Sequence, residues 1–137
     1  MAAPLSIRLP EQTLKRLGTQ AESAHQPLRT LAQRYVEEGL RMDEHPMIRF
    51  AGGPAGRRAR LVGTGLDVWE AIEVIRDNGS DLDAAGEYLE IDPGKLGAAV
   101  SYYGSYSAEI DQMIAANNRA ATEARDAWQA GMDALAG

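Results

Sequence analysis

The feature that most constrains this chain is a strictly alternating apolar and polar stretch that stands directly before two helix-like stretches. Residues 5–9 read LSIRL, and this alternation predicts a strand with Ser6 and Arg8 on the face opposite its apolar residues. Apolar residues at helical spacing then predict one helix over 11–23 and a second over 27–42. The chain is therefore expected to begin with a β-α-α unit.

A β-α-α unit confined to residues 1–42 has a physical difficulty. About 40 residues rarely bury enough apolar surface to fold alone without a disulfide, a metal or oligomerisation. A lone strand also leaves its backbone N–H and C=O groups unpaired. Both difficulties disappear if two copies pair their strands and interlock their helices, so we expect an intertwined homodimer.

The remainder of the chain changes character twice. Residues 43–66 are rich in glycine, and two short strands are expected at 48–50 and 58–62, joined by a GGPAG turn. Capping signals then predict three short helices, which begin after Asp67, after Ser80 or Asp81, and after Asp92. These elements predict a small helical domain over residues 43–106.

The last predicted element, over residues 107–137, is a long helix with a stripe spaced alternately by four and three residues. The stripe consists of Ile110, Ile114, Asn117, Ala121, Ala124, Trp128, Gly131 and Leu135. Two interpretations stay open at this point. The stripe packs on the chain's own core, or it lies in a groove of another protein.

Charge divides unevenly along the chain. Residues 1–66 hold ten Lys and Arg against six Asp and Glu, a net charge of +4. Residues 67–137 hold four against fourteen, which gives −10 and leaves the whole chain at −6. The asymmetry suggests two different partners or a chain that neutralises itself. An acidic second half is better suited to a basic protein than to nucleic acid.

No catalytic or metal-binding motif stands out. The chain has no cysteine, and His25 and His45 lack companions at metal-ligand spacing. The glycine-rich stretch lacks the Lys-Ser/Thr ending of a phosphate-binding loop, and no GxSxG sequence is present. We therefore expect a protein that is not an enzyme and needs no cofactor or metal. Neither a membrane-spanning apolar run nor a secretory leader is evident, so a cytoplasmic location is expected.

The basic first half contains the residues expected to bind DNA. A two-stranded ribbon fits the major groove, where an outward-facing arginine can bond guanine. The alternative is that Arg8 is a solvated charge that protects a strand edge from aggregation. The candidate DNA-binding residues are Ser6, Arg8, Lys15, Gln26 and Arg29 in the first unit, with Arg57, Arg58 and Arg60 in the hairpin.

Two segments resemble known families. The stretch over residues 4–42, with its IRLP strand and LAQRYVEEGLR helix, resembles a ribbon-helix-helix domain of the CopG/Arc type. That resemblance implies an intertwined dimer whose ribbon reads DNA through Ser6 and Arg8. The sequence departs from the family at the turn before the second helix, where it has His-Gln-Pro.

Residues 45–106 are similar to a small winged-helix-like antitoxin family. The resemblance lies in the His-Pro start, the GGPAG turn, and the Gly-Thr step that leads into three short helices. Genes of that family commonly stand beside a PIN-like ribonuclease toxin, so the resemblance implies an antitoxin. Here Gly65 replaces the family's usual arginine.

The sequence thus predicts a mainly α protein with three parts. They are an N-terminal ribbon-helix-helix, a small winged-helix-like domain and a long C-terminal helix. The expected function is that of a type II antitoxin, which binds operator DNA as a homodimer, represses its own promoter and neutralises a PIN-like toxin. The residues expected to contact the toxin are Ile110, Ile114, Trp128 and Leu135. The alternatives are a stand-alone ribbon-helix-helix regulator with a ligand-sensing or oligomerising second domain, or an interaction scaffold without a DNA role.

Overall fold

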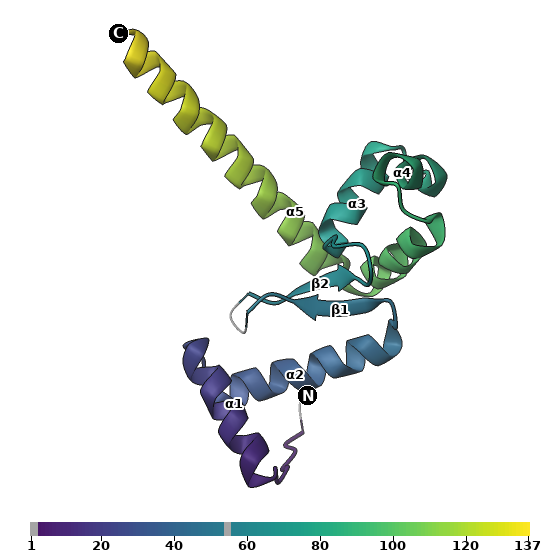
Figure 1. Cartoon of the computed structure of the whole chain (residues 1–137), viewed down its shortest axis with the longest axis vertical. Coiled ribbons are helices and arrows are strands. Elements are labelled where there is room, and N and C mark those ends of the chain that lie inside the picture. Colours follow the sequence, from purple (N-terminus) through teal and green to yellow (C-terminus); the bar gives the residue numbers. More distant parts are fainter. Residues whose placement is uncertain (1–2, 54–55) are drawn as a thin grey trace. The chain divides into compact units, whose positions relative to one another are not determined.

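The computed structural model describes residues 3–53 and 56–137, which are mainly helical (Figure 1). The elements in chain order are α1 (Glu11–Ser23), α2 (Leu28–Glu44), β1 (Ile48–Ala51), β2 (Arg58–Leu61), α3 (Val68–Asp77), α4 (Leu82–Leu89) and α5 (Pro93–Ala136). The chain divides into two compact units, here called unit 1 (residues 1–59) and unit 2 (residues 60–137).

The prediction of an N-terminal β-α-α ribbon-helix-helix is wrong. Residues 3–10 form neither strand nor helix, and the first strand follows two helices. The alternation of residues 5–9 gives no strand because a strand needs a hydrogen-bonding partner, and β1 and β2 pair with each other. Leu9 packs on the core of unit 1, whereas Leu5 is 78% exposed.

The two predicted helices of unit 1 are confirmed as α1 and α2. Each begins directly after a proline, Pro10 or Pro27, whose fixed φ favours a helix start. The helices pack on each other through a small cluster of buried residues, Leu17, Ala21 and Leu31. Tyr35 and two other partly buried apolar side chains cover this cluster.

The predicted hairpin strands are also confirmed, as β1 and β2. Gly52 leaves β1 with φ +102°, and a Cβ atom there would collide with the carbonyl oxygen of Gly56. The tip of the expected GGPAG turn, residues 54 and 55, lies outside the described residues. The sequence grouped this hairpin with the helices that follow, whereas the boundary between the units falls within β2.

Unit 2 is built from three helices, and α5 packs on both α3 and α4. Asp67 and Glu70 form the predicted capping box of α3, and Asp81 accepts hydrogen bonds from two N–H groups at the start of α4. The buried residues of this core are Val68, Ala71, Ile72, Ile75, Ala85, Leu96, Ala99, Tyr102, Ile110 and Ile114.

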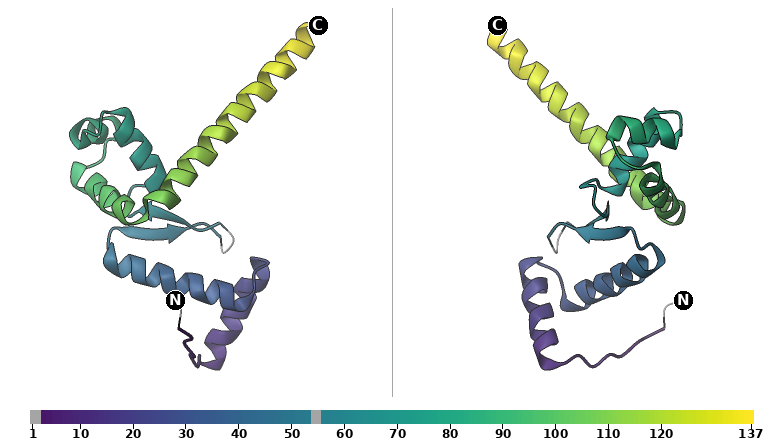
Figure 2. Two further views of the ribbon diagram at one scale, coloured as in Figure 1. Left: turned by 180° about the vertical axis from the view of Figure 1, so that it is seen from behind. Right: turned by 45° about the vertical axis from the view of Figure 1, so that its right-hand side comes forward.

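The two helices predicted over 93–104 and from 107 onward are confirmed as the two parts of α5, which are separated by a break in helical geometry. Tyr106 marks the junction, with φ −132° and ψ 36°. Beyond Ile114 every residue of α5 is exposed, and residues 115–136 project from unit 2 as a helical arm (Figure 2). Among the described residues no helix is both long and apolar enough to cross a bilayer.

Candidate functional site

Most of the predicted DNA-binding residues of unit 1 are exposed. Ser6 and Arg8 lie in the extended segment before α1, Lys15 lies on α1, and Arg29 lies in the first turn of α2. Gln26 is half-buried in the turn between the two helices, and its Oε1 is buried without a hydrogen-bond partner among the described residues. All five of these predicted DNA-binding residues therefore belong to unit 1.

The three hairpin arginines make contacts within the chain. Arg57 donates from Nε to both carboxylate oxygens of Glu38, each at 2.7 Å. Arg58 donates to the carbonyl of Gly56, and Arg60 forms an ion pair with buried Asp67 at 3.1 Å. A role in DNA binding stays a prediction for these three arginines. Arg57 and Arg60 also form ion pairs within the fold, which the sequence did not reveal.

Glu38 is the centre of the polar network in unit 1. Its side chain is 5% exposed and also accepts a hydrogen bond from Arg34 at 2.9 Å. Arg34 donates in turn to the backbone carbonyl of Arg57, which ties α2 to the segment that enters β2. The Arg34–Glu38 spacing of four residues was visible in the sequence. Arg57 is 19 residues from Glu38, and no local pattern signals that pair.

Four cations of unit 1 lack such contacts. Arg8, Lys15, Arg16 and Arg29 are exposed and form no ion pair or hydrogen bond through their side chains with any described residue. Arg29 stands at the N-terminal end of α2, where the helix dipole disfavours a positive charge and no acidic residue offsets it. Arg16 was not a candidate in the sequence, although it directly follows Lys15. These four side chains are available to an anionic partner.

The predicted partner-binding residues on α5 separate into two sets. Ile110 and Ile114 are buried in unit 2, so they belong to the core that α5 forms with α3. Trp128 is 63% exposed and Leu135 is 83% exposed on the arm. Met132, which the sequence analysis missed, is also exposed and lies one turn after Trp128 on the same side. Trp128, Met132 and Leu135 thus form an exposed apolar face of the arm.

The base of the arm is held by a polar cluster of Arg76, Tyr103 and Asp111. Arg76, in the last turn of α3, donates to Asp111 at 2.7 Å, and the Tyr103 hydroxyl donates to the same carboxylate oxygen at 2.8 Å. Arg76 also bonds the Tyr103 hydroxyl and lies 5.2 Å from the centre of its ring. Tyr103 precedes Tyr106 and Asp111 follows it, so the cluster spans the break in α5.

This cluster predicts that the direction of the arm depends on pH. The hydrogen bond from Arg76, with a second from Tyr103, lowers the pKa of the Asp111 carboxyl. Because this pKa is lowered, ionised Asp111 stabilises the cluster fully above the ordinary carboxyl pKa. That stabilisation is lost as the pH falls through the lowered pKa. The hydrogen bond to Asp111 raises the pKa of Tyr103, so at the alkaline end the phenol keeps its proton beyond the ordinary tyrosine pKa.

We expect acidification to release this half-exposed cluster and shift the direction of the arm, while Ile110 and Ile114 keep the start of the helix in the core. The chain has no cysteine, so single cysteines introduced on α3 and on the arm can carry a fluorescent donor and acceptor. Energy transfer between them should change as the solution becomes acidic, and Asp111→Asn should already show the acid value at pH 7. Transfer that stays constant in both proteins contradicts the prediction.

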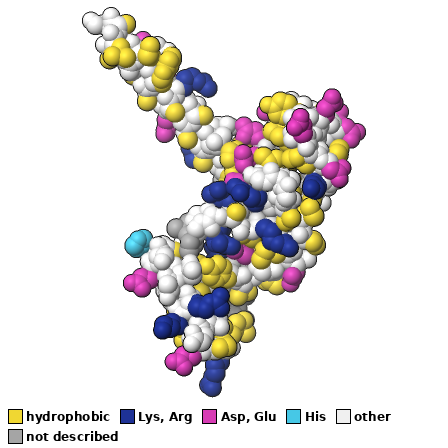
Figure 3. Space-filling view, in the orientation of Figure 1, with side chains coloured by type: hydrophobic (Ala, Val, Ile, Leu, Met, Phe, Trp, Pro, Cys, Tyr) yellow, Lys and Arg dark blue, Asp and Glu magenta, His cyan; other side chains and the backbone are white. Residues whose placement is uncertain are grey.

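Charge separates strongly between the two units. Unit 1 has nine Lys and Arg against six Asp and Glu, a net charge of +3. Unit 2 has five against fourteen, a net charge of −9. On the face shown in Figure 3, acidic side chains gather over the α4 part of unit 2. The residues of α4 and its flanks that carry this charge are Asp81, Asp83, Glu87, Glu90 and Asp92.

Comparison with known proteins adds no relative. No family model, curated protein or solved structure matches the chain. No group of three or more His, Asp or Glu side chains suited to a metal ion occurs in the described part of the chain. The features that bear on function are therefore the exposed cations of unit 1, the acidity of unit 2 and the arm.

Proposed function

We propose that this protein is an antitoxin that binds operator DNA as a homodimer through unit 1 and neutralises a basic, PIN-like ribonuclease through unit 2. Binding of the operator represses its own promoter. The observation that carries the proposal is the exposed apolar face of the arm, Trp128, Met132 and Leu135, on an acidic unit. An arm of this kind is suited to lie in a groove of another protein.

The arm has the properties of a helix that is ready to bind. Nine of the 22 residues over 115–136 are alanine, the best helix former, so the helix persists without tertiary packing. Its first turns continue a helix that is anchored in the core by Ile110 and Ile114, which removes the cost of nucleation. A preformed arm loses little conformational entropy when a partner covers it.

The charge of unit 2 indicates the kind of partner. A ribonuclease that holds RNA needs a basic groove, and a net charge of −9 on unit 2 resembles the charge of that substrate. The same charge repels DNA phosphates, so unit 2 is expected to stay away from DNA. Unit 1 is the part suited to DNA, because its net charge is +3 and four of its exposed cations form no ion pair with any described residue.

Unit 1 also has the apolar surface that a homodimer needs. The exposed large apolar side chains of this unit are Leu5, Ile7, Leu14, Leu28, Val36 and Leu40. They lie on α1, α2 and the segment before them, and the buried cluster between the two helices is small. A second copy that covers these side chains adds to this small core and doubles the number of cations presented to DNA.

Replacing Arg8 with alanine should weaken operator binding and lower the slope of log K against log salt by about 1 per copy, as expected for the loss of a phosphate contact. Arg8 is exposed and its side chain forms no hydrogen bond or ion pair with a described residue, so the fold should not change. Arg125→Ala, which removes the same charge from the arm, is the matched control. Fluorescence anisotropy with DNA from upstream of the gene measures the effect, and light scattering reports whether the samples are dimers. Unchanged binding, or a monomer at micromolar concentration, would contradict the proposal.

A further inference from the structure

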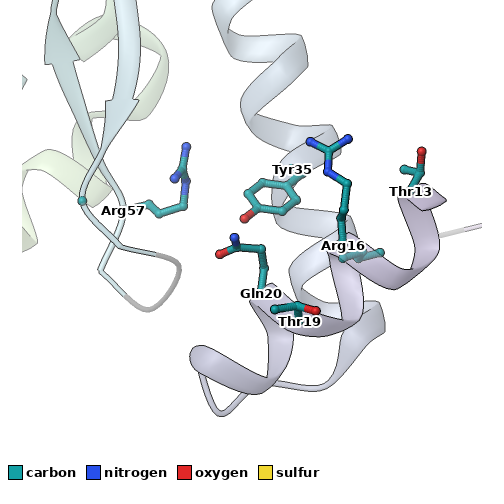
Figure 4. Close-up of a pocket in the computed structure, with 8 residues that line it drawn as sticks. Thr13, Arg16, Thr19, Gln20, Tyr35 and Arg57 are labelled. Atoms are coloured by element: carbon teal, nitrogen blue, oxygen red, sulfur yellow. The ribbon is translucent and has the colours of Figure 1, made fainter.

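Unit 1 contains a groove between α1 and the hairpin that none of the roles above uses. Its volume is about 630 Å³. Figure 4 shows Thr13, Arg16, Thr19 and Gln20 on α1, Tyr35 on α2 and Arg57 on the segment that enters β2. Leu17 and Gly52 complete the lining.

The lining has the chemistry of an anion site. It includes two guanidinium groups and four neutral hydrogen-bonding side chains, and no carboxylate is among the described lining residues. Arg16 has no ion pair with any described residue. Arg57 shares the single carboxylate of Glu38 with Arg34, so that cluster keeps a net charge of +1. With Arg16, about two positive charges therefore remain around the groove.

The donors around the groove are also positioned in advance. Arg57 is held through Nε by Glu38 and lies 5.5 Å from the centre of the Tyr35 ring, while its Nη1 donates no hydrogen bond to a described residue. The hydroxyl of the half-buried Tyr35 likewise has no hydrogen-bond partner in the described part of the chain. Unused donors that are fixed in place suit a ligand with several acceptor oxygens.

We propose that this groove binds a phosphate group through Arg16, Arg57 and the Tyr35 hydroxyl. A phosphate group can accept two parallel hydrogen bonds from a planar guanidinium group and has enough oxygens for all three donors. Two sources supply such a group, the phosphodiester backbone of DNA and a free phosphate ion or monoester. The DNA source rests on the proposed function, whereas the phosphate chemistry of the groove does not.

The first experiment measures DNA binding by full-length protein as a function of salt concentration. Each phosphate contact contributes about one unit to the slope of log K against log salt, so Arg16→Gln should lower the slope by about 1 per copy. Tyr35→Phe should weaken binding without changing the slope, because it removes a donor and no charge. Arg125→Gln on the arm is the control and should change neither quantity.

The second experiment titrates full-length protein with inorganic phosphate and follows its amide and arginine Nε–H signals by NMR. Signals of Thr13, Arg16, Gln20 and Arg57 should shift in the native protein and stay unchanged in Arg16→Gln. Shifts at the groove without a slope change identify a free phosphate as the source and support the site. If neither the NMR signals nor the salt slope changes, the phosphate site is refuted. Normal operator binding in the same experiments would leave the proposed function standing. Absence of operator binding in the native protein refutes the proposed function, and the phosphate titration still decides the groove.

Discussion

Replacing Trp128 with alanine should abolish tight binding of the ribonuclease and leave DNA binding unchanged. Trp128 is the largest apolar side chain of the arm and is 63% exposed before any partner covers it. Truncation of a buried tryptophan at the centre of an interface costs about 2–4 kcal/mol, which is roughly 30- to 700-fold in Kd. Isothermal titration with the purified toxin, together with an assay of its RNA cleavage, measures the loss.

The structure also decides how the arm should be truncated. A chain that ends at residue 114 keeps Ile110 and Ile114 in the core and removes only exposed residues. A chain that ends at residue 106 would remove both isoleucines and Asp111, so its loss of function would be ambiguous. The shorter deletion should end neutralisation and preserve the thermal unfolding of unit 2.

The matched control for Trp128 is Thr122→Ala. Thr122 lies on the arm outside the apolar face, and alanine favours the helix more than threonine does. This variant should bind and neutralise the toxin as the native protein does. Full neutralisation by both Trp128→Ala and the chain that ends at residue 114 would move the partner site away from the arm and contradict its proposed role.

Replacing Glu38 with alanine should lower the free energy of unfolding of unit 1 by about 3 kcal/mol, because it leaves the guanidinium of Arg57 without its partner. The Glu38 side chain is 5% exposed and that of Arg57 is 20% exposed, so water compensates little of the lost charge pair. Arg34 has a 43% exposed side chain, and its own contribution to the pair should be below about 1 kcal/mol. The cost therefore comes mainly from Arg57.

Native-state hydrogen exchange of the α2 amides in the full chain measures this effect, since the two units need not unfold together. Glu37→Ala, which removes the 54% exposed carboxylate of the Arg41–Glu37 pair on the same helix, is the control and should cost little. The double variant Glu38→Ala, Arg57→Ala should regain part of the lost stability. If Glu38→Ala costs no more than Glu37→Ala, the network has no structural role.

Helix starts could be predicted from the sequence because their signals act over a few residues. Asp67 with Glu70, and Asp81, satisfy backbone N–H groups within one turn. Pro10 and Pro27 set the backbone angle for the residue that follows. These interactions form whatever the rest of the chain does, so the helices lie close to where they were expected.

The absence of a strand at residues 5–9 could not be predicted in the same way. Alternation shows which side chains share a face, but a strand exists only if another strand supplies its hydrogen bonds. β1 and β2 supply them to each other, so residues 3–10 remain without regular structure. The pattern was correct for Leu9, which packs on the core, and failed for Leu5, which is exposed.

By itself the sequence determined the helices, the hairpin strands and the division of charge, because these depend on neighbouring residues or on composition. The tertiary structure alone decided that Arg57 binds Glu38, that Ile110 and Ile114 lie in the core, and that Trp128 and Leu135 remain exposed on the arm. An apolar stripe along a helix does not reveal the point at which the helix stops packing against the core. That point depends on the length of α3, which packs against the first part of α5 and leaves the residues beyond Ile114 uncovered.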